Sequence, residues 1–277
     1  MKLGLLGRTL GHSLSPEIHA EVFKRLHLEG WSYDLIEKEP DEVASFLTAT
    51  KPECDGSNVT IPYKEQVIPY LKEITPEAAN IGAVNTLFFT PEGLKGYNTD
   101  YIGFRRMLAH AGITVSGEAV TVLGNGGAAK AVLQALVDEK AASVTIVARN
   151  EEKARISLAH FLKNHPETKI VTYEGLDTVT TGGVIVNTTP VGMYPKVGVS
   201  AAPADFTAQY AAAVDLIYNP SETQFLKDAR LAGQKTCNGL YMLVAQAIAS
   251  EEIWQQKQLD PQLVPDIMKV LEAAAHA

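Results

Sequence analysis

Four short polar segments in the first hundred residues carry side chains that could do chemistry. They contain hydroxyls, amides, one lysine and one aspartate, in the stretches 12–16 (HSLSP), 58–64 (NVTIPYK), 82–86 (GAVNT) and 96–100 (GYNTD). Each segment falls at an end of an expected strand, which is where open α/β sheets bind their ligands. Such groups suit a small polyhydroxylated carboxylic acid as the ligand.

Each of these residues also has a purely structural interpretation. Ser15 stands before Pro16, the pattern of a helix with serine as its N-cap and proline at its first position. Asp100 could cap the helix expected over residues 101–111 in the same way. Lys64 could be a solvent-facing lysine, and Asn85 could serve a turn. Taken singly, none of these residues establishes a binding site.

The segment 120–130, VTVLGNGGAAK, carries the sharpest local signal in the sequence. An expected strand runs directly into Gly124, Gly126 and Ala129, and a helix of good formers follows. Glycines permit a tight turn and the close approach of backbone N–H groups to a pyrophosphate, and the helix N-terminus adds partial positive charge. The pattern favours a dinucleotide site over the alternative, an ordinary turn between a strand and a helix.

The end of the next expected strand bears on which dinucleotide binds. In NAD-selective sites a carboxylate about 20 residues beyond the glycines binds the ribose 2′-hydroxyl, whereas an arginine accommodates a 2′-phosphate. Here Arg149 follows the strand and Lys153 lies one turn later, so the two cations could bind a 2′-phosphate. Glu151 or Glu152 could instead bind a ribose hydroxyl, and the side chains of Arg149 and Lys153 could both be simply solvated. Taken together, the residue types at this turn favour NADP over NAD.

The elements that must position these residues alternate between strands and helices. Strands are expected at 3–6, 33–36, 56–60, 84–89, 93–97, 119–123, 144–147, 170–173, 184–186 and 213–217. The runs 84–89 and 93–97 flank a turn and predict a hairpin. Helices are expected at 16–28, 41–49, 101–111, 240–256 and 261–275. Short buried runs alternating with helices predict a parallel sheet covered on both faces.

Length and composition limit the class of protein. The chain has 277 residues, nearly twice the usual domain length of about 150, which predicts two compact units. A net charge of −8 is poorly suited to a phosphate backbone, so we expect no nucleic-acid partner. The two cysteines lie far apart in the sequence, which argues against a disulfide framework. No apolar run is long enough for a signal peptide or a membrane span. We therefore expect a cytoplasmic protein with no membrane partner.

Eight segments in a fixed order resemble the shikimate dehydrogenase family. They are GHSLSPEIH, DGSNVTIPYK, GAVNT, GYNTD, GNGGAAKA, NTTPVGM, DLIYNP and GLYMLVAQ, and the resemblance runs from residue 4 to about residue 255. It implies an α/β protein of two domains with a cleft between them. A Rossmann-type, doubly wound parallel NADP domain is expected at 104–237. An α/β substrate-binding, catalytic domain with a mainly parallel sheet is expected at 1–103 and 238–277. The implied activity is the NADPH-dependent interconversion of 3-dehydroshikimate and shikimate in aromatic amino acid biosynthesis.

The resemblance also implies roles for individual residues. Lys64 and Asp100 are implied as the catalytic pair, with Lys64 as the general acid/base. The implied substrate-binding residues are Ser13, Ser15, Thr60, Lys64, Asn85, Asp100, Tyr218 and Gln246. The implied cofactor-binding residues are Gly124, Asn125, Gly126, Gly127, Ala128, Ala148, Arg149, Asn150, Lys153, Leu216 and Gly239. The sequence departs from the family pattern in two segments. Asn125 replaces a small residue, and Ala148-Arg149-Asn150 replaces Asn-Arg-Thr, followed by Lys153 where many members have arginine.

Two other functions stay open. One is a quinate/shikimate dehydrogenase that uses NAD as well as NADP, and the other is a non-catalytic dinucleotide sensor on the same fold. The seven histidines show no pair at i,i+4 spacing and no companion cluster of cysteine or glutamate, so we expect no metal. The expected assembly is a monomer or a homodimer.

Overall fold

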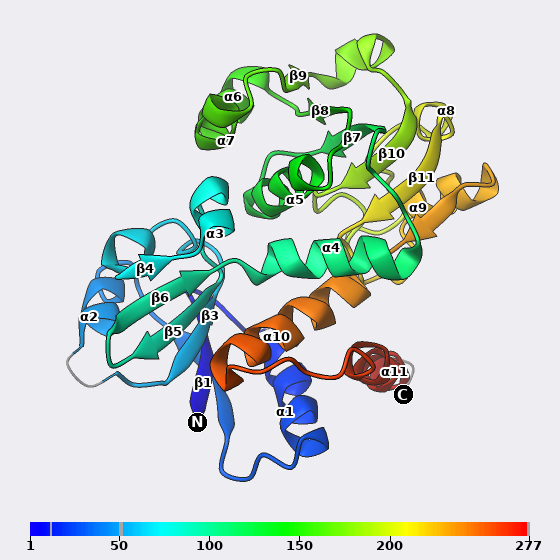
Figure 1. Ribbon diagram of the computed structural model, residues 1–277. Coiled ribbons are helices and arrows are strands. Elements are labelled where there is room, and N and C mark those ends of the chain that lie inside the picture. The colour runs from blue at the N-terminus through cyan, green and yellow to red at the C-terminus, as the bar shows by residue number, and fades with distance from the viewer. Residues whose placement is uncertain (12, 50–51, 276–277) are drawn as a thin grey trace. The chain divides into compact units, whose positions relative to one another are not determined.

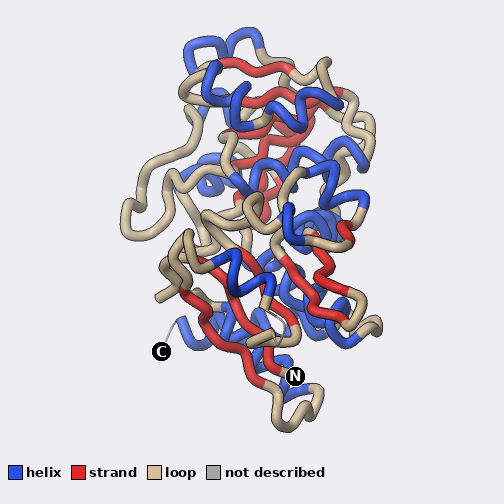
Figure 2. The backbone as a smooth tube through the Cα atoms, turned by 90° about the vertical axis from the view of Figure 1, so that its left-hand side faces the viewer, coloured by secondary structure: helices blue, strands red, loops and turns tan. Residues whose placement is uncertain are grey.

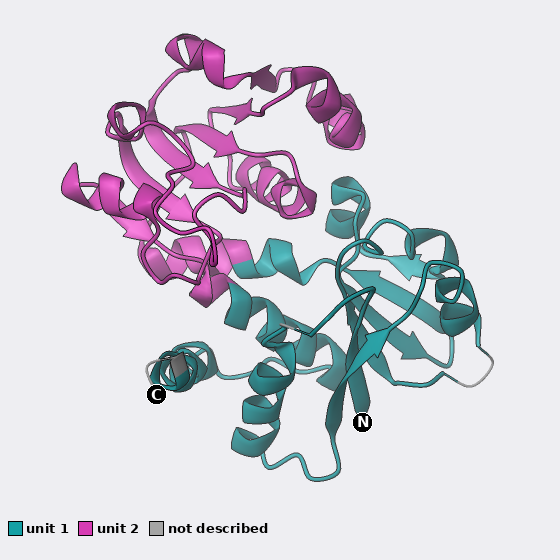
Figure 3. Ribbon diagram, turned by 180° about the vertical axis from the view of Figure 1, so that it is seen from behind, with its two compact units in different colours: residues 1–103, 243–277 teal, residues 104–242 magenta. Residues whose placement is uncertain are grey.

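The computed structural model describes residues 1–11, 13–49 and 52–275, and the chain divides into two compact units (Figure 3). Unit 1 comprises Met1–Gly103 and Leu243–Ala277, and unit 2 comprises Phe104–Met242. The sequence predicts domain boundaries at 103/104 and 237/238. The predicted domains and the observed units both place Gln246 together with Lys64. Within the described residues, no helix combines the length and the apolar character needed to cross a membrane.

Unit 1 is built on a mixed sheet of six strands (Figure 1). The strands are β1 (Lys2–Gly7), β2 (Ser32–Glu37), β3 (Gly56–Val59), β4 (Glu73–Ile74), β5 (Thr86–Thr90) and β6 (Gly93–Tyr97), in the order β2-β1-β3-β5-β6-β4. β1 pairs in parallel with β2 and β3, whereas β5 is antiparallel to β3 and β6, which confirms the expected hairpin. The carboxyl ends of β1, β3 and β6 and the amino end of β5 therefore share one edge. All four polar segments of the sequence adjoin that edge.

Both faces of this sheet are covered, because alternate residues of β1 enter separate cores. Leu3 and Leu5 pack in a cluster with Trp254, and Leu6 packs in a second cluster with Phe46. The helices of unit 1, two of which continue into unit 2, are α1 (Ser15–Arg25), α2 (Val43–Thr48), α3 (Pro76–Ile81), α4 (Thr99–Ala111), α10 (Leu240–Gln255) and α11 (Leu263–Ala275). A Cβ at Gly56 would lie 2.3 Å from Nε1 of Trp254, so only glycine lets the indole approach β3.

Unit 2 is built on a parallel sheet of six strands. The strands are β7 (Ala119–Leu123), β8 (Ser143–Val147), β9 (Lys169–Val171), β10 (Gly182–Asn187), β11 (Tyr210–Asp215) and β12 (Lys235–Cys237), in the order β12-β11-β10-β7-β8-β9. The helices beside it, shown in blue in Figure 2, are α5 (Gly127–Asp138), α6 (Glu151–Ser157), α7 (Ala159–Asn164), α8 (Ala204–Thr207) and α9 (Gln224–Leu231). The strand order reverses between β7 and β10, and doubly wound sheets bind ligands at such a switch point.

Some elements differ from the expectation. The edge strands β4 and β12 have only two and three residues, too few for a recognisable pattern, and were not expected. β11 begins at Tyr210, three residues before the expected start, because the alanines at 211–213 lie in a central parallel strand despite their low strand propensity. The mixed α/β architecture with mainly parallel sheets is confirmed.

Candidate active site

A lysine and an aspartate form an ion pair at the shared edge of the unit 1 sheet. Nζ of Lys64 lies 2.6 Å from Oδ2 of Asp100, and the two side chains are 21% and 16% exposed. Lys64 follows β3, and its backbone carbonyl accepts the N–H of Val84 at 2.8 Å, which ties it to the segment before β5. Partial exposure leaves the pair accessible to a small molecule.

Asn85 orients the carboxylate of this pair. Its Nδ2 donates to Oδ1 of Asp100 at 3.0 Å, so both carboxylate oxygens have a donor. The orientation of the Asn85 amide is fixed, because the backbone N–H of Thr99 lies 2.6 Å from Oδ1 and can only donate. Asn85 is buried and acts as more than a turn residue.

The two helix caps considered for the site residues do not form. Asn98 caps α4 in place of Asp100, because its Oδ1 accepts the N–H of Tyr101 at 3.1 Å. Helix α1 begins at Ser15 itself, with Leu14 in the cap position and no side-chain cap bond. The capping interpretation is therefore wrong for both Ser15 and Asp100.

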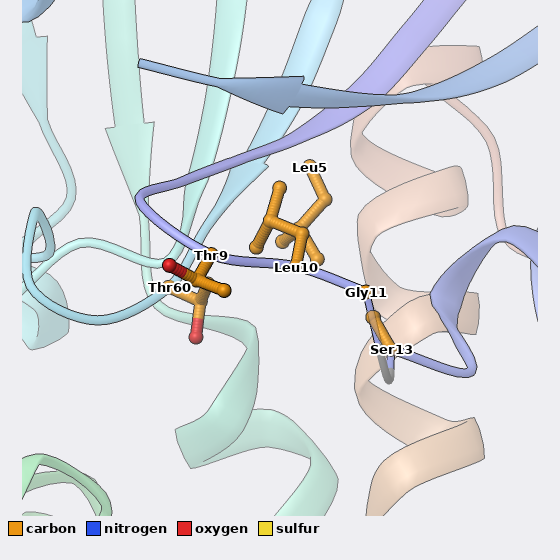
Figure 4. Close-up of a pocket in the computed structure, with 6 residues that line it drawn as sticks. All are labelled: Leu5, Thr9, Leu10, Gly11, Ser13 and Thr60. Atoms are coloured by element: carbon orange, nitrogen blue, oxygen red, sulfur yellow. The ribbon is translucent and has the colours of Figure 1, made fainter. Parts of the chain in front are cut away.

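Ser13 after β1 and Thr60 after β3 lie at one pocket, whose lining does not include Ser15. The pocket holds about 280 Å³ and is lined by Leu5, Thr9, Leu10, Gly11, Ser13 and Thr60 (Figure 4). Oγ of Ser13 donates to Oγ of Ser15 at 3.1 Å and accepts the Ser15 N–H at 3.2 Å. Thr9 was not expected, since no spacing or motif marks it. His12 of the same motif lies outside the described residues.

Helix α10 brings a glutamine from the end of the chain into unit 1. Nε2 of Gln246 donates to the backbone carbonyl of Leu243 at 2.8 Å, and the side chain is partly exposed. One turn later, the buried Ser250 accepts a hydrogen bond from Nδ2 of Asn58 at 2.8 Å. That bond ties α10 to β3 across 192 residues of sequence.

A buried polar cluster lies behind the ion pair and was not singled out from the sequence. Asn58 is its centre, since Oδ1 accepts from the phenol of Tyr33 at 2.7 Å and Nδ2 donates to Oγ1 of Thr86 at 3.0 Å. The hydroxyls of Thr86 and Thr99 lie 3.0 Å apart. Polar residues in strands that are otherwise apolar were the available signal, because buried polar groups require partners. The partners themselves are distant in sequence.

The glycine turn of unit 2 leaves its backbone open to a ligand. Gly124 has a φ of +102°, and a Cβ there would lie 2.8 Å from Cγ2 of Thr189, so the position requires glycine. A Cβ on Gly126 or Gly127 would meet no atom within 4 Å. Helix α5 begins at Gly127, so its first N–H groups point to this open space, where a pyrophosphate fits. The amide of Asn125 donates away from the turn, to Ser157 at 2.8 Å.

The turn after β8 presents two exposed cations. Arg149 and Lys153 are both exposed, and Asn150 caps α6 by accepting the Lys153 N–H at 2.8 Å. Glu151 is paired with Arg155 at 2.7 Å, which occupies one of the two carboxylates that could have served a ribose hydroxyl. Ala148 is buried beneath the turn. This arrangement suits a 2′-phosphate.

A third part of unit 2 holds Leu216 and Gly239 in close contact. The Gly239 N–H donates to the carbonyl of Ile217 at 3.0 Å, and a Cβ at Gly239 would lie 2.0 Å from the Leu216 carbonyl oxygen. Leu216 and Tyr218 are both partly exposed. The close backbone approach accounts for glycine at position 239.

Asp215, immediately before that corner, is a fully buried carboxylate. Burial raises its pKa to about 6, and hydrogen bonds from Thr223, Ile217 and Asn187 oppose the increase. Because the unfolded pKa is near 3.8, the folded chain binds a proton between about pH 4 and pH 6 that the unfolded chain does not. The free energy of unfolding therefore falls by about 3 kcal/mol as the pH rises through that window.

We expect Asp215→Asn to remove this pH dependence. An asparagine can accept from Ile217 and Asn187 through its oxygen and donate to the Thr223 hydroxyl, which can also accept. Denaturant unfolding at pH 4.5 and pH 7.5 measures the effect, and the stability of the variant relative to the parent should rise at the higher pH. An equal difference at both pH values contradicts the assignment.

Comparisons with known proteins match both parts of the chain to one family. Residues 5–87 match the shikimate dehydrogenase substrate binding domain, and residues 107–189 match the shikimate / quinate 5-dehydrogenase domain. The chain is 41% identical to a shikimate dehydrogenase (NADP(+)) of Clostridium beijerinckii, over 97% of each chain.

Two solved structures resemble the whole chain. A chorismate mutase/shikimate 5-dehydrogenase fusion protein from Clostridium acetobutylicum superposes with a TM-score of 0.90 and 44% identity, over 100% of this chain and 98% of that one. Shikimate 5-dehydrogenase from Thermus thermophilus, in complex with NADP(H) and shikimate, gives a TM-score of 0.83 and 32% identity over 97% and 98%. The chain belongs to the shikimate dehydrogenase family.

Proposed function

We propose that the chain catalyses the reversible, NADPH-dependent reduction of 3-dehydroshikimate to shikimate, a step of aromatic amino acid biosynthesis in the cytoplasm. The observation that carries the proposal is the ion pair of Lys64 and Asp100, oriented by Asn85 at the sheet edge where the polar segments meet. The names and bound ligands of the relatives support the same substrate and cofactor. Residues 1–103 and 238–277 form the substrate-binding domain, and residues 104–237 form the dinucleotide-binding domain.

Each substrate group has a partner in this proposal. The hydroxyls of Ser13 and Ser15 donate to the carboxylate. The ring hydroxyls are held by Thr60, Asn85, Asp100 and Gln246. Apart from Asp100, these groups are neutral hydrogen-bonding side chains, and a site built to pair with hydroxyls rejects analogues that lack them.

Lys64 is the general acid/base. An ammonium has three N–H donors, and in the structure one of them is directed to Oδ2 of Asp100. In the reductive direction another of these protons passes to the carbonyl oxygen of the substrate, and in the oxidative direction the amine takes it back from the alcohol. Asp100 holds the amine in place throughout.

The residues of unit 2 fit NADP. The open backbone at Gly124, Asn125, Gly126, Gly127 and Ala128 would hold the pyrophosphate, and the turn at Ala148, Arg149, Asn150 and Lys153 would hold the adenosine 2′-phosphate. Leu216 and Gly239 would lie at the nicotinamide. When bound, the nicotinamide supplies the hydride.

We expect Arg149→Ala to raise the KM for NADP by about 10- to 100-fold, because it removes hydrogen bonds to a charged group worth about 1.5–3 kcal/mol. The KM for NAD, which lacks the 2′-phosphate, should change by less than about 3-fold. Arg155→Ala is the matched control, since Arg155 is an exposed arginine on the adjoining helix that is paired with Glu151. Equal changes for the two dinucleotides show that Arg149 does not bind the 2′-phosphate.

Steady-state rates with shikimate and quinate, each with NADP and NAD, test the proposed function. The largest kcat/KM is expected for shikimate with NADP. Comparable turnover of quinate with NAD identifies the chain instead as a quinate/shikimate dehydrogenase. Dinucleotide binding without turnover in any of the four combinations identifies it as a sensor.

A further inference from the structure

A continuous series of buried hydrogen bonds leads from β2 to the catalytic aspartate. It begins at the phenol of Tyr33, 2.7 Å from Oδ1 of Asn58. Asn58 Nδ2 contacts Oγ1 of Thr86 at 3.0 Å, and that hydroxyl contacts Oδ1 of Asn85 at 3.1 Å. Asn85 then donates to Oδ1 of Asp100 at 3.0 Å. All of these residues belong to unit 1.

Ser250 determines which atoms donate and which accept in the hydrogen bonds of Asn58. Its hydroxyl donates to the backbone carbonyl of Gln246 at 3.0 Å, and a carbonyl can only accept. Ser250 has one proton, so towards Asn58 its oxygen can only accept, and Asn58 must present its NH₂ group to it. Oδ1 of Asn58 therefore faces Tyr33, and the phenol must be the donor.

The donor and acceptor roles at Asn58 in turn affect those at Thr86 and Asn85. Because Asn58 donates to Thr86, the Thr86 hydroxyl can donate to Oδ1 of Asn85, although Oγ1 of Thr99 and Oγ of Ser250 also lie within 3.1 Å of it. Oδ1 of Asn85 also accepts from the N–H and the hydroxyl of Thr99, so three donors surround this end of the amide. Its other end, Nδ2, is thereby held against Asp100.

The phenol of Tyr33 is itself fixed. Its ring stacks on the imidazole of His19 with centroids 3.9 Å apart and an interplanar angle of 8°. Nδ1 of His19 lies 2.6 Å from Oε1 of Glu251 on α10, and both side chains are fully buried. Burial raises the pKa of Tyr33 well above its usual value, whereas the neighbouring Ser15 side chain lowers it. The phenol therefore keeps the proton that it donates.

We propose that Tyr33 is a positioning residue for the catalytic pair, acting through Asn58, Thr86 and Asn85 on Asp100. This inference rests on the proposed roles of Lys64 and Asp100. Tyr33 holds no group of the substrate in this proposal, and its effect reaches the reaction through how firmly the Asn85 amide is held against Asp100.

Removing the Tyr33 hydroxyl leaves Oδ1 of Asn58 buried without its donor, so the Asn58 side chain loses one of the contacts that fix it. An Asn58 side chain that is held less firmly fixes the Thr86 hydroxyl less firmly towards Asn85. Asn85 keeps the Thr99 N–H as a donor, but its amide is held less firmly against Asp100.

The test is Tyr33→Phe, which keeps the ring on His19 and removes only the hydroxyl. We expect kcat for 3-dehydroshikimate reduction to fall about 10-fold and KM to change less than about 3-fold, since the lost interaction acts on the catalytic pair. Tyr210→Phe is the matched control: it removes a buried phenol that donates to Thr121 at 2.8 Å in unit 2. Its kcat should stay within about 2-fold of the parent value.

A double-mutant cycle separates positioning from general destabilisation. In an Asn85→Ala background, Tyr33→Phe should lower kcat by less than about 2-fold, because the residue through which it acts is gone. An unchanged kcat in Tyr33→Phe, or the same fold-loss in both backgrounds, overturns the inference. If Lys64→Ala also keeps near-parent kcat, the proposed function fails; if Lys64→Ala loses it, only the role of Tyr33 fails.

Discussion

Replacing Lys64 with alanine is expected to lower kcat by about 10²- to 10⁴-fold, the usual loss when a general acid/base is removed. The KM for shikimate should change far less, because the other side chains proposed to bind the substrate stay in place. The physical reason is the ion pair with Asp100, which holds the amine at the sheet edge where the reacting oxygen is proposed to bind. Steady-state kinetics in both directions measures the effect.

Lys95→Ala is the control for loss of a charged pair. Lys95 lies on β6 of the same unit, 2.9 Å from Oε2 of Glu73, and it is absent from the proposed site. Its replacement removes a lysine–carboxylate pair of the same type without touching the pocket, so kcat should be unchanged. A kcat for Lys64→Ala within a few-fold of the parent would exclude Lys64 from proton transfer.

Replacing Trp254 with alanine is expected to destabilise unit 1 by about 3–5 kcal/mol, the cost of removing a large aromatic from a core. The indole is 2% exposed, packs with Leu3 and Leu5, and donates through Nε1 to the carbonyl of Leu87 at 2.9 Å. Gly56 offers no side chain that could fill the space. Denaturant unfolding monitored by circular dichroism measures the loss.

Trp31→Ala provides the matched comparison. Trp31 is only partly buried and packs edge-on against Phe23, with centroids 5.7 Å apart, so its loss should cost about 1 kcal/mol. Trp254→Ala should also raise the KM for shikimate at temperatures where it remains folded, because α10 carries Gln246. Equal destabilisation by the two substitutions would contradict the assigned packing.

The sequence was most informative where a local rule applies. The strand–glycine–helix order of unit 2 and the hairpin of unit 1 depend on neighbouring residues, and both are present in the structure. The ion pair is different in kind: Lys64 and Asp100 are 36 residues apart, and no spacing rule predicts their 2.6 Å contact. Only the order of the motifs, through their resemblance to a family, suggested it.

The cluster around Asn58 shows what a single sequence conceals. Its partners lie 25, 28 and 192 residues away, on a strand, a second strand and a helix. Tertiary packing alone brings them together. The alternative of Asp100 as a helix cap failed for a related reason, because several polar residues near the start of α4 could cap it and a shift of one residue decides which of them does. At α4 that residue was Asn98.

The discontinuity of unit 1 also sets an order for folding during synthesis. Unit 2 is contiguous, so its sheet can be completed as soon as its last strand leaves the ribosome. The core of unit 1 cannot be completed at that point, because Leu87, Asn58 and His19 form hydrogen bonds with residues of α10. These partners lie 167, 192 and 232 residues further along the sequence. Until then the N-terminal sheet lacks one covering layer and exposes the apolar residues that Trp254 later buries. The unit that is translated first is therefore the last to complete its core.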